Sequence, residues 1–260
     1  MSLHIVPHRI DYARIHVYNG THMKKIIQKL FSHSPDDRPS PDAPLTYGEM
    51  EDAAIRRTHI ISHEIKRAFE FMENYPKSVT ILGSARIPED NPYYAKARRL
   101  AQRISTELKY TVITGGGPGI MEAANRGAFE AKGTSIGINI KLPREQHPNV
   151  YLTAFVNFYY FFTRKVSLFF SAEAYIAFPG GFGTFDELFE IITLVQTKKI
   201  PRVPIILVGS DFWNDFDAVI RKQAVERVKT INLEEMSAYT ITDNDDEILD
   251  IIKRAPLRRE

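Results

Sequence analysis

The stretch FPGGFGTFDELFE, residues 178–190, combines residue types that can hold a phosphorylated ligand and act on it. Its glycines lie between an apolar run and an amphipathic segment. Glycine lets backbone N–H groups approach an anion closely, and the start of a helix adds free N–H groups and partial positive charge. Asp186 and Glu187 follow at once. A carboxylate beside a sugar can stabilise the charge that develops when a glycosidic bond breaks, so we predict a phosphate loop with a carboxylate next to the sugar.

The same letters also have a purely structural interpretation. Thr184 and Glu187 have the spacing of a capping box, with Thr as the N-cap and Glu at the third helical position. Asp186 would then be favoured by the helix dipole alone. A phosphate at the loop would use the N–H groups that a cap otherwise uses, so the two interpretations compete for the same atoms.

Two further segments also place glycine after an apolar run, LGSAR at residues 82–86 and TGGGPGIME at residues 114–122. One such turn between a strand and a helix is ordinary. Two multi-glycine loops favour a ligand site, since ligands of open parallel sheets bind beyond the carboxyl ends of the strands. The fingerprint G-x-G-x-x-G fails from Gly115, because its last position is Ile120, and no G-K-[ST] follows for a P-loop. We expect a phosphorylated ligand without either of these sites.

A pair of cations, Arg164 and Lys165, interrupts the aromatic stretch FYYFFTRKVSLFF at residues 158–170. One interpretation is a helix whose polar face happens to carry two cations. The other places the pair over the strand ends, where arginine can clamp a phosphate or polarise a leaving group and lysine supplies a point charge. The flanking aromatic rings could stack on a planar base, although most are expected in the core.

The histidines do not favour a metal site. His59 and His63 stand at i and i+4 as in the zinc motif H-E-x-x-H, but the letters are H-I-I-S-H and the glutamate is missing. Two histidines also need a third ligand nearby, and the chain has no cysteine. We therefore expect neither a metal nor another cofactor.

The elements that must position these residues alternate along the chain. Short apolar runs followed by amphipathic segments predict an α/β fold, an open parallel sheet with helices on both faces. The expected strands are residues 78–83, 110–117, 134–140, 174–181 and 203–209, and the expected helices are residues 92–108, 120–132, 158–171 and 184–197. An amphipathic helix over residues 49–74 precedes them. Residues 1–75 are expected to form a mainly helical N-terminal extension, and residues 76–260 the main domain.

Composition limits the function classes. The chain has 260 residues, 43% of them hydrophobic, and its net charge of +2 gives no reason to expect a nucleic-acid partner. Its first residues lack the apolar run of a signal peptide, and the aromatic stretch is too short and too charged to cross a membrane. With no cysteine in the chain, these features lead us to expect a cytoplasmic protein.

The letters PGGFGTFDE at residues 179–187 match the pattern P-G-G-x-G-T-x-x-E, and here the chain resembles the Lonely Guy (LOG) family. The resemblance extends to GSAR at residues 83–86, to TGGGPGIMEAANRGA at residues 114–128 and to the Arg-Lys pair. Members of that family are cytokinin riboside 5′-monophosphate phosphoribohydrolases, historically labelled possible lysine decarboxylases. The long N-terminal part is similar to that of the larger bacterial members.

The resemblance implies a Rossmann-like catalytic domain that hydrolyses the N-glycosidic bond of a purine nucleoside 5′-monophosphate, either AMP or a cytokinin-type nucleotide. The products would be the free base and ribose 5-phosphate. The family's catalytic arginine and glutamate fall on Arg164 and Glu187, and the family forms homo-oligomers, dimers or larger. With the glycine loops included, the expected substrate-binding residues are Gly83, Ser84, Gly116, Gly117, Gly119, Lys165, Gly180, Gly181, Gly183, Thr184 and Thr193.

Two other function classes stay open. One is a nucleotide-binding sensor or carrier on the same fold, which the presence of both Arg164 and Glu187 disfavours. The other is the decarboxylase of the old label. A pyridoxal-phosphate enzyme needs a Schiff-base lysine and an acid for the ring nitrogen. Lys165 is the only lysine adjacent to the motifs, and no acid for the ring nitrogen is apparent. The preferred base does not follow from the letters, and Glu122 and Asp186 are the candidates for the proton donor.

Overall fold

The computed structural model describes residues 47–142, 148–170 and 172–256. The chain divides into two compact units, Met1–His59 and Ile60–Glu260. Helix α2, Tyr47–Met72, contributes residues to both units, and every later element belongs to the second. The predicted domain boundary after residue 75 stays a prediction, and most of the predicted N-terminal extension lies outside the described residues.

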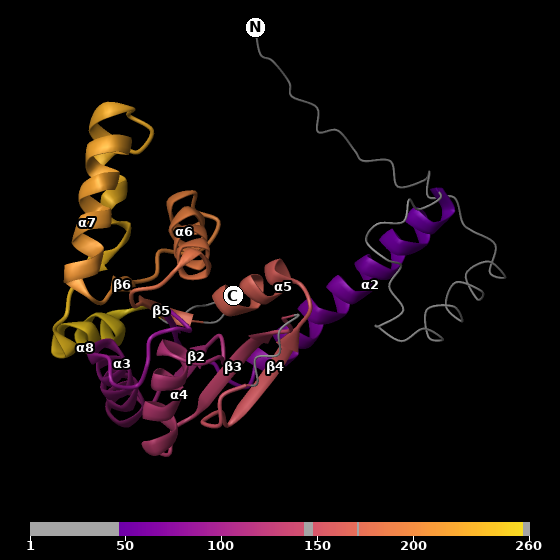
Figure 1. Ribbon diagram of the computed structural model, residues 1–260, viewed down its shortest axis with the longest axis horizontal. Helices are drawn as coiled ribbons and strands as arrows, with labels where there is room; N and C mark the ends of the chain where they lie inside the picture. Colours follow the sequence, from indigo (N-terminus) through magenta and orange to yellow (C-terminus); the bar gives the residue numbers. More distant parts are fainter. Residues whose placement is uncertain (1–46, 143–147, 171, 257–260) are drawn as a thin grey trace, which may run out of the picture. The chain divides into compact units, whose positions relative to one another are not determined.

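One sheet of seven parallel strands forms the centre of the second unit, in the order β4-β3-β2-β1-β5-β6-β7 (Figure 1). The strands are β1 (Ser78–Leu82), β2 (Thr111–Thr114), β3 (Ser135–Ile140), β4 (Ala154–Phe158), β5 (Ala172–Ala177), β6 (Ile205–Leu207) and β7 (Thr240–Ile241). Strands β1, β2, β5 and β6 are buried at every position. This explains why their sequences are mostly apolar and lack a regular alternation, with buried polar residues at Ser78, Thr80, Thr111, Thr114 and Glu173.

Helices cover both faces of this sheet. They are α3 (Pro92–Arg103), α4 (Ile120–Glu130), α5 (Phe161–Phe170), α6 (Phe182–Gln196), α7 (Ser210–Ile220) and α8 (Asp245–Arg254). Shorter helical turns are η2 (Ile104–Leu108), η3 (Arg221–Arg227) and η4 (Leu233–Ala238). Alternate residues of β5 separate the two cores: Ala174 and Ile176 pack with α3, α4 and α8, whereas Tyr175 packs with α5, α6 and the end of α2. The predicted α/β fold is confirmed.

Two expectations about the elements need correction. The predicted helix over residues 158–171 is wrong at its start, because Ala154–Phe158 forms strand β4 and α5 begins only at Phe161. Strand β4 lies at the edge of the sheet, and its side chains alternate between buried and exposed, so it lacks the mostly apolar pattern of the central strands. No elements were predicted after residue 209, where the structure has α7, η3, η4, β7 and α8.

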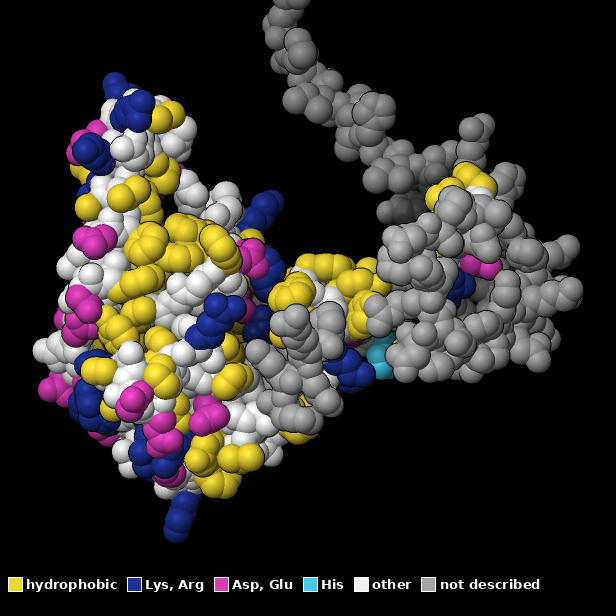
Figure 2. Space-filling model, in the orientation of Figure 1, with side chains coloured by type: hydrophobic (Ala, Val, Ile, Leu, Met, Phe, Trp, Pro, Cys, Tyr) yellow, Lys and Arg dark blue, Asp and Glu magenta, His cyan; other side chains and the backbone are white. Residues whose placement is uncertain are grey.

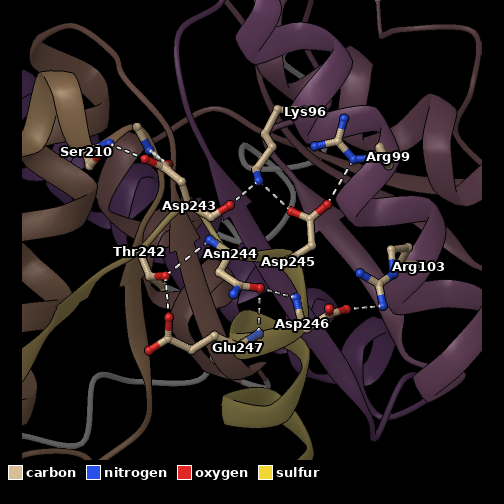
Figure 3. Close-up of polar contacts among 11 residues, drawn as sticks. Lys96, Arg99, Arg103, Ser210, Thr242, Asp243, Asn244, Asp245, Asp246 and Glu247 are labelled. Carbon is tan, nitrogen blue, oxygen red and sulfur yellow. Dashed lines mark hydrogen bonds and ion pairs between the residues drawn. The ribbon is translucent and has the colours of Figure 1, made fainter.

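Carboxylates at the start of the C-terminal helix α8 connect this part of the chain to α3 and α7 (Figure 3). Asp245 lies 2.6 Å from the Lys96 ammonium and 2.9 Å from Arg99 Nε on α3. Burial works to raise the pKa of Asp245, but the hydrogen bonds from Lys96 and Arg99 outweigh it, so this pKa lies below its ordinary value. Asn244 caps α8, and Asp243 accepts N–H groups at the start of α7 at 2.6 and 3.0 Å. Asp243 and Asp245 therefore have a structural role, since they hold α7 and α3 next to the start of α8.

Among the described helices, none is long and apolar enough to cross a membrane. Nor do the described side chains contain a group of three His, Asp or Glu residues arranged to hold a metal ion.

Candidate functional site

The carboxyl ends of β2, β1 and β5 lie side by side, because these strands are neighbours in the sheet. The order of the chain reverses between β1 and β5, and ligands of open α/β sheets bind at such a switch point. Backbone hydrogen bonds join the loops: Ser84 N donates to the Pro179 carbonyl oxygen at 3.2 Å, and Ile120 N donates to the Ser84 carbonyl oxygen at 3.0 Å. The fold therefore brings the three predicted glycine segments together.

The glycines of these loops serve different purposes. Gly116 and Gly119 have φ angles of +72° and +70°, in the left-handed region that other residues avoid. A Cβ on Gly119 would lie 2.8 Å from the Ala85 carbonyl carbon, so it would push apart the loops after β1 and β2. By contrast, a Cβ added to Gly181 or Gly183 would meet no atom of the described residues within 4 Å. The start of α6 therefore faces open space.

Helices α4 and α6 begin at this edge without a side-chain cap. Their N-cap residues are Gly119 and Gly181, and within the described residues no side chain accepts from the N–H groups of either first turn. The neighbouring helices differ, since Asn91 caps α3, Asn244 caps α8 and Asp243 accepts the first N–H groups of α7. Uncapped helix N-termini are suited to anions.

The capping box suggested by the sequence is not present. Helix α6 begins at Phe182, so Thr184 is its third residue and Gly181, in an extended conformation, is the N-cap. The Thr184 side chain is buried against the loop, where a Cβ on Gly180 would lie 2.5 Å from the Thr184 Cβ. Glu187 is therefore too far along the helix to reach back to the N-cap, and its carboxylate contacts another element.

That element is α5, whose Arg164 reaches Glu187 across the strand ends. Arg164 Nη1 donates to Glu187 Oε1 at 2.5 Å, and Arg164 Nε donates to the Ile138 carbonyl oxygen at 2.7 Å. A Cβ on Gly115 would lie 2.5 Å from Arg164 Nη2, so the guanidinium lies directly over the loop after β2. The two side chains are 8% and 13% exposed. The structure thus brings the two predicted catalytic residues together in a nearly buried ion pair.

Lys165, the residue after Arg164, also contacts α6. Its ammonium lies 3.0 Å from Asp186 and 2.6 Å from Glu190. Burial works to lower the pKa of Lys165, but the hydrogen bonds to Glu190 and Asp186 outweigh it and raise this pKa above its ordinary value. Both carboxylates of this cation pairing belong to α6, which no sequence pattern had linked to Lys165.

A groove of about 490 Å³ lies along α6 beside these ion pairs. It is lined by Phe182, Phe185, Asp186, Phe189, Glu190, Thr193 and Leu194. Figure 2 shows hydrophobic side chains gathered over this helix, and Phe182 is 94% exposed. The Thr193 hydroxyl donates to the Phe189 carbonyl oxygen of its own helix at 2.7 Å. The predicted contact residue Thr193 is therefore on the groove, one side of which is polar and the other aromatic.

The sequence did not identify the residues that support the loop after β2. Asn149 donates from its backbone N–H to the Gly116 carbonyl oxygen at 2.9 Å and from Nδ2 to the Gly117 carbonyl oxygen at 3.1 Å. Asn149 Nδ2 also donates to Asn125 Oδ1 at 2.9 Å, and the Thr114 hydroxyl donates to the same oxygen at 2.6 Å. All three side chains are buried. This network holds two predicted substrate-binding glycines. Thr114 and Asn125 lie within the quoted motif at residues 114–128, whereas nothing in the letters links Asn149 to it.

The remaining predicted residues fall on the same edge or close to it. Ser84 Oγ accepts the Arg86 backbone N–H at 3.0 Å, which shapes the loop after β1. Glu122, a candidate proton donor, instead accepts a hydrogen bond from the Tyr94 hydroxyl at 3.0 Å. Burial, followed by the interaction with Glu122, raises the pKa of Tyr94 to about 12. Asp186, the other candidate, is the carboxylate that contacts Lys165.

Comparison with known proteins gives three findings. The model of the family described as possible lysine decarboxylase matches residues 121–252, just over half of the chain. The cytokinin riboside 5′-monophosphate phosphoribohydrolase of Rhodococcoides fascians is 26% identical over 155 residues, which cover 58% of this chain and 77% of the relative. A probable enzyme of the same name from Oryza sativa subsp. japonica is 31% identical over 127 residues, which cover 47% of this chain and only 50% of the relative.

Among solved structures, the X-ray structure of TM1055 is similar with a TM-score of 0.50 and 23% sequence identity. The match covers 68% of this chain and 99% of that chain. This similarity supports the fold of the second unit.

Proposed function

This chain belongs to the possible lysine decarboxylase family, also called the LOG family, and from that premise we propose that it hydrolyses the N-glycosidic bond of a purine nucleoside 5′-monophosphate. The products are the free base and ribose 5-phosphate. The observation that carries this proposal is the proximity of two uncapped helix N-termini to the Arg164–Glu187 ion pair at one switch point of the sheet.

The phosphate binds at the starts of α4 and α6 in this proposal. No described side chain accepts the N–H groups of either first turn, although Ile120 N of α4 donates to the Ser84 carbonyl oxygen, and the open space at Gly181 and Gly183 admits an anion. Lys165, whose ammonium contacts Asp186 and Glu190 of α6, is proposed to contribute to nucleotide binding. Binding the phosphate away from the bond that breaks lets its binding energy position the ribose against Glu187.

Glu187 is proposed to stabilise the ribose as the C–N bond breaks. The bonding electrons leave with the base nitrogen, the anomeric carbon gains positive charge, and a nearby carboxylate stabilises that charge. Water then forms the new C–O bond, and the proton that it releases balances the one taken up by the base. Arg164 orients the base or Glu187, but it cannot supply the proton because guanidinium does not deprotonate in proteins.

The base is proposed to lie toward the groove along α6. Phe182, Phe185 and Phe189 provide apolar surface on which a purine or an apolar N6 substituent can pack. Both AMP and a cytokinin-type nucleotide fit this description, and the relatives carry cytokinin riboside 5′-monophosphate in their names. We also propose a cytoplasmic homo-oligomer as the working form.

The decarboxylase of the family description is disfavoured by Lys165. A Schiff-base lysine needs a deprotonated amine. Here Glu190 and Asp186 hold the ammonium at 2.6 and 3.0 Å and raise its pKa. Their effect stabilises the charged form of this side chain.

The test is to incubate the protein with AMP and with isopentenyladenosine monophosphate and to measure free base by chromatography. Glu187→Gln keeps the size of the side chain, and we expect it to lower turnover on the order of 100-fold or more while nucleotide binding survives. Glu226→Gln, a change at an exposed carboxylate of η3, is the matched control. Nucleotide binding by the wild type without any release of base would establish the sensor or carrier class instead, and normal turnover by Glu187→Gln would refute the role of that residue.

A further inference from the structure

Glu64 of α2 is a buried carboxylate that serves a different helix. Its side chain comes from the part of α2 within the second unit, and the residue is only 6% exposed. Its carboxylate accepts three hydrogen bonds, from the backbone N–H groups of Tyr159 at 2.5 Å and Tyr160 at 3.4 Å and from the Thr163 hydroxyl at 2.6 Å. All three donors lie at the start of α5, almost a hundred positions further along the chain.

This arrangement supplies α5 with an N-terminal cap from another element. The first N–H groups of a helix have no partner within the helix, and a carboxylate there satisfies them and interacts favourably with the helix dipole. A buried carboxylate is in turn stabilised only by such donors. Thr163 is fully buried, and its hydroxyl oxygen also lies 2.9 Å from the Tyr160 carbonyl oxygen, a second acceptor for the same hydrogen. Glu64 therefore contacts both the backbone that leads into α5 and a side chain of its first turn.

Arg164 is the next residue of that turn. Its backbone N–H donates to the Tyr160 carbonyl oxygen at 3.2 Å, and its side chain spans the strand ends to Ile138 and Glu187. The guanidinium is also closely packed, since it lies directly over Gly115. A shift of the first turn of α5 would move the Arg164 side chain with it.

Helix α2 is itself anchored to the sheet, so it can hold α5 in place. Ala68 and Met72 are buried in the same core as α5 and α6. Arg67 donates to the Asn157 carbonyl oxygen of β4, the strand that leads into α5. The end of α2 thus contacts β4, which precedes the turn that carries Arg164, and shares a hydrophobic core with the part of α5 that follows it.

We propose that Glu64 is a positioning residue of the site, which holds the first turn of α5 so that Arg164 meets Glu187. The end of α2 is then part of the machinery of the site, although Glu64 itself does not touch the substrate. The activity readout of this inference rests on the proposed function, and the exchange readout described below does not.

The experiment compares Glu64→Ala, Glu64→Gln and the wild type. The control is Glu70→Ala, on the same helix. The Glu70 side chain is 62% exposed, and its carboxylate lies 3.7 Å from the ammonium of Lys66, which is also exposed. Three quantities are measured: hydrogen–deuterium exchange of the amides of residues 159–164, kcat and KM with AMP, and binding of AMP to each variant.

For Glu64→Ala we expect faster exchange of these amides and a fall in kcat of about tenfold or more, with KM changed by less than about threefold. Glu64→Gln should recover part of the loss, because its amide oxygen still accepts a hydrogen bond, and Glu70→Ala should behave as the wild type. A purely structural role would lower the folded fraction without this separation of kcat from KM and without the rescue.

Two results would overturn the inference. One is unchanged exchange at residues 159–164 in folded Glu64→Ala. The other is unchanged kcat in that variant while the wild type is active. If Glu64→Ala does not fold, Glu64→Gln decides, since it keeps the side-chain volume and must still show faster exchange than the wild type. A wild type without glycosidase activity would defeat the proposed function, and the exchange result would still decide the role of Glu64.

Discussion

Replacing Gly183 by alanine should separate ligand binding from stability. Gly183 is the second residue of α6, its backbone is outside the left-handed region, and within the described part of the chain an added Cβ would meet nothing within 4 Å. Alanine therefore fits the folded chain without strain. If a phosphate binds against this turn, however, the new methyl group occupies the space through which its oxygens approach the N–H groups. We expect Gly183→Ala to fold normally and to bind nucleotide poorly.

The size of each effect follows from the local structure. Alanine is favoured over glycine within a helix by about 0.5–1 kcal/mol. For a domain of this size, 1 kcal/mol corresponds to roughly 2–4 °C in Tm, so Tm should stay level or rise by up to about 4 °C. Hydrogen bonds to a charged group contribute about 1.5–3 kcal/mol. Loss of one such bond to the phosphate should raise Kd by roughly 10- to 100-fold.

The assays are thermal unfolding without ligand and calorimetric titration with AMP and with ribose 5-phosphate. Gly48→Ala is a close control, because Gly48 is also the second residue of a helix, α2, and an added Cβ there also meets no described atom within 4 Å. Binding of AMP by Gly183→Ala with wild-type affinity would show that no phosphate lies against the start of α6. A lower Tm would show that the space at Gly183 is not open.

Two further predictions concern the folded state. Gly180→Ala places a Cβ 2.5 Å from the Thr184 Cβ and should lower the free energy of unfolding by about 1–3 kcal/mol. Gly181→Ala is the control, because its added Cβ meets no described atom within 4 Å. Equal Tm values for the two variants would contradict this prediction. Asp245→Asn should cost about 1–3 kcal/mol at neutral pH. The pKa of Asp245 is lowered in the folded state, so its contribution is present above the ordinary carboxyl pKa of about 4 and is lost as pH falls through the lowered value. Urea midpoints between pH 7 and pH 3 should therefore fall less steeply on acidification in Asp245→Asn, and parallel curves would refute the assignment.

The central elements and their glycine loops could be predicted because their signals are local. Strands β1, β2, β5 and β6 are buried on both faces, which gives mostly apolar runs, and glycine follows where the chain must turn closely. Since parallel strands present their carboxyl ends at one edge, the loops after β1, β2 and β5 were expected to meet there, and they do. The roles assigned to Arg164 and Glu187 stay predictions, although their contact fits them.

The parts that were not predicted depend on contacts distant in sequence or on weaker patterns. Edge strand β4 is exposed on one side and lies next to an aromatic helix, so its period of two was hidden. The N-terminus of α8 does have a local signal, Asn244 followed by acidic residues and then apolar residues at helical spacing. The helix start at Phe182 was missed because glycine at position 183 suggested a loop. Nothing in the letters around Glu64 points to α5, since its partners lie far along the chain.

The pairing of β1 with β2 on one side and β5 on the other has a consequence for the nascent chain. While the polypeptide is being synthesised, β1 can pair with β2 long before β5 has left the ribosome, and the other edge of β1 then exposes unpaired backbone N–H and C=O groups. Insertion of β5 closes that edge. The same step joins Ser84 to Pro179 and brings the loops of the candidate site together. A nucleotide that needs both loops would therefore bind only the completed sheet, and by mass action it would favour the last stage of folding over its precursors.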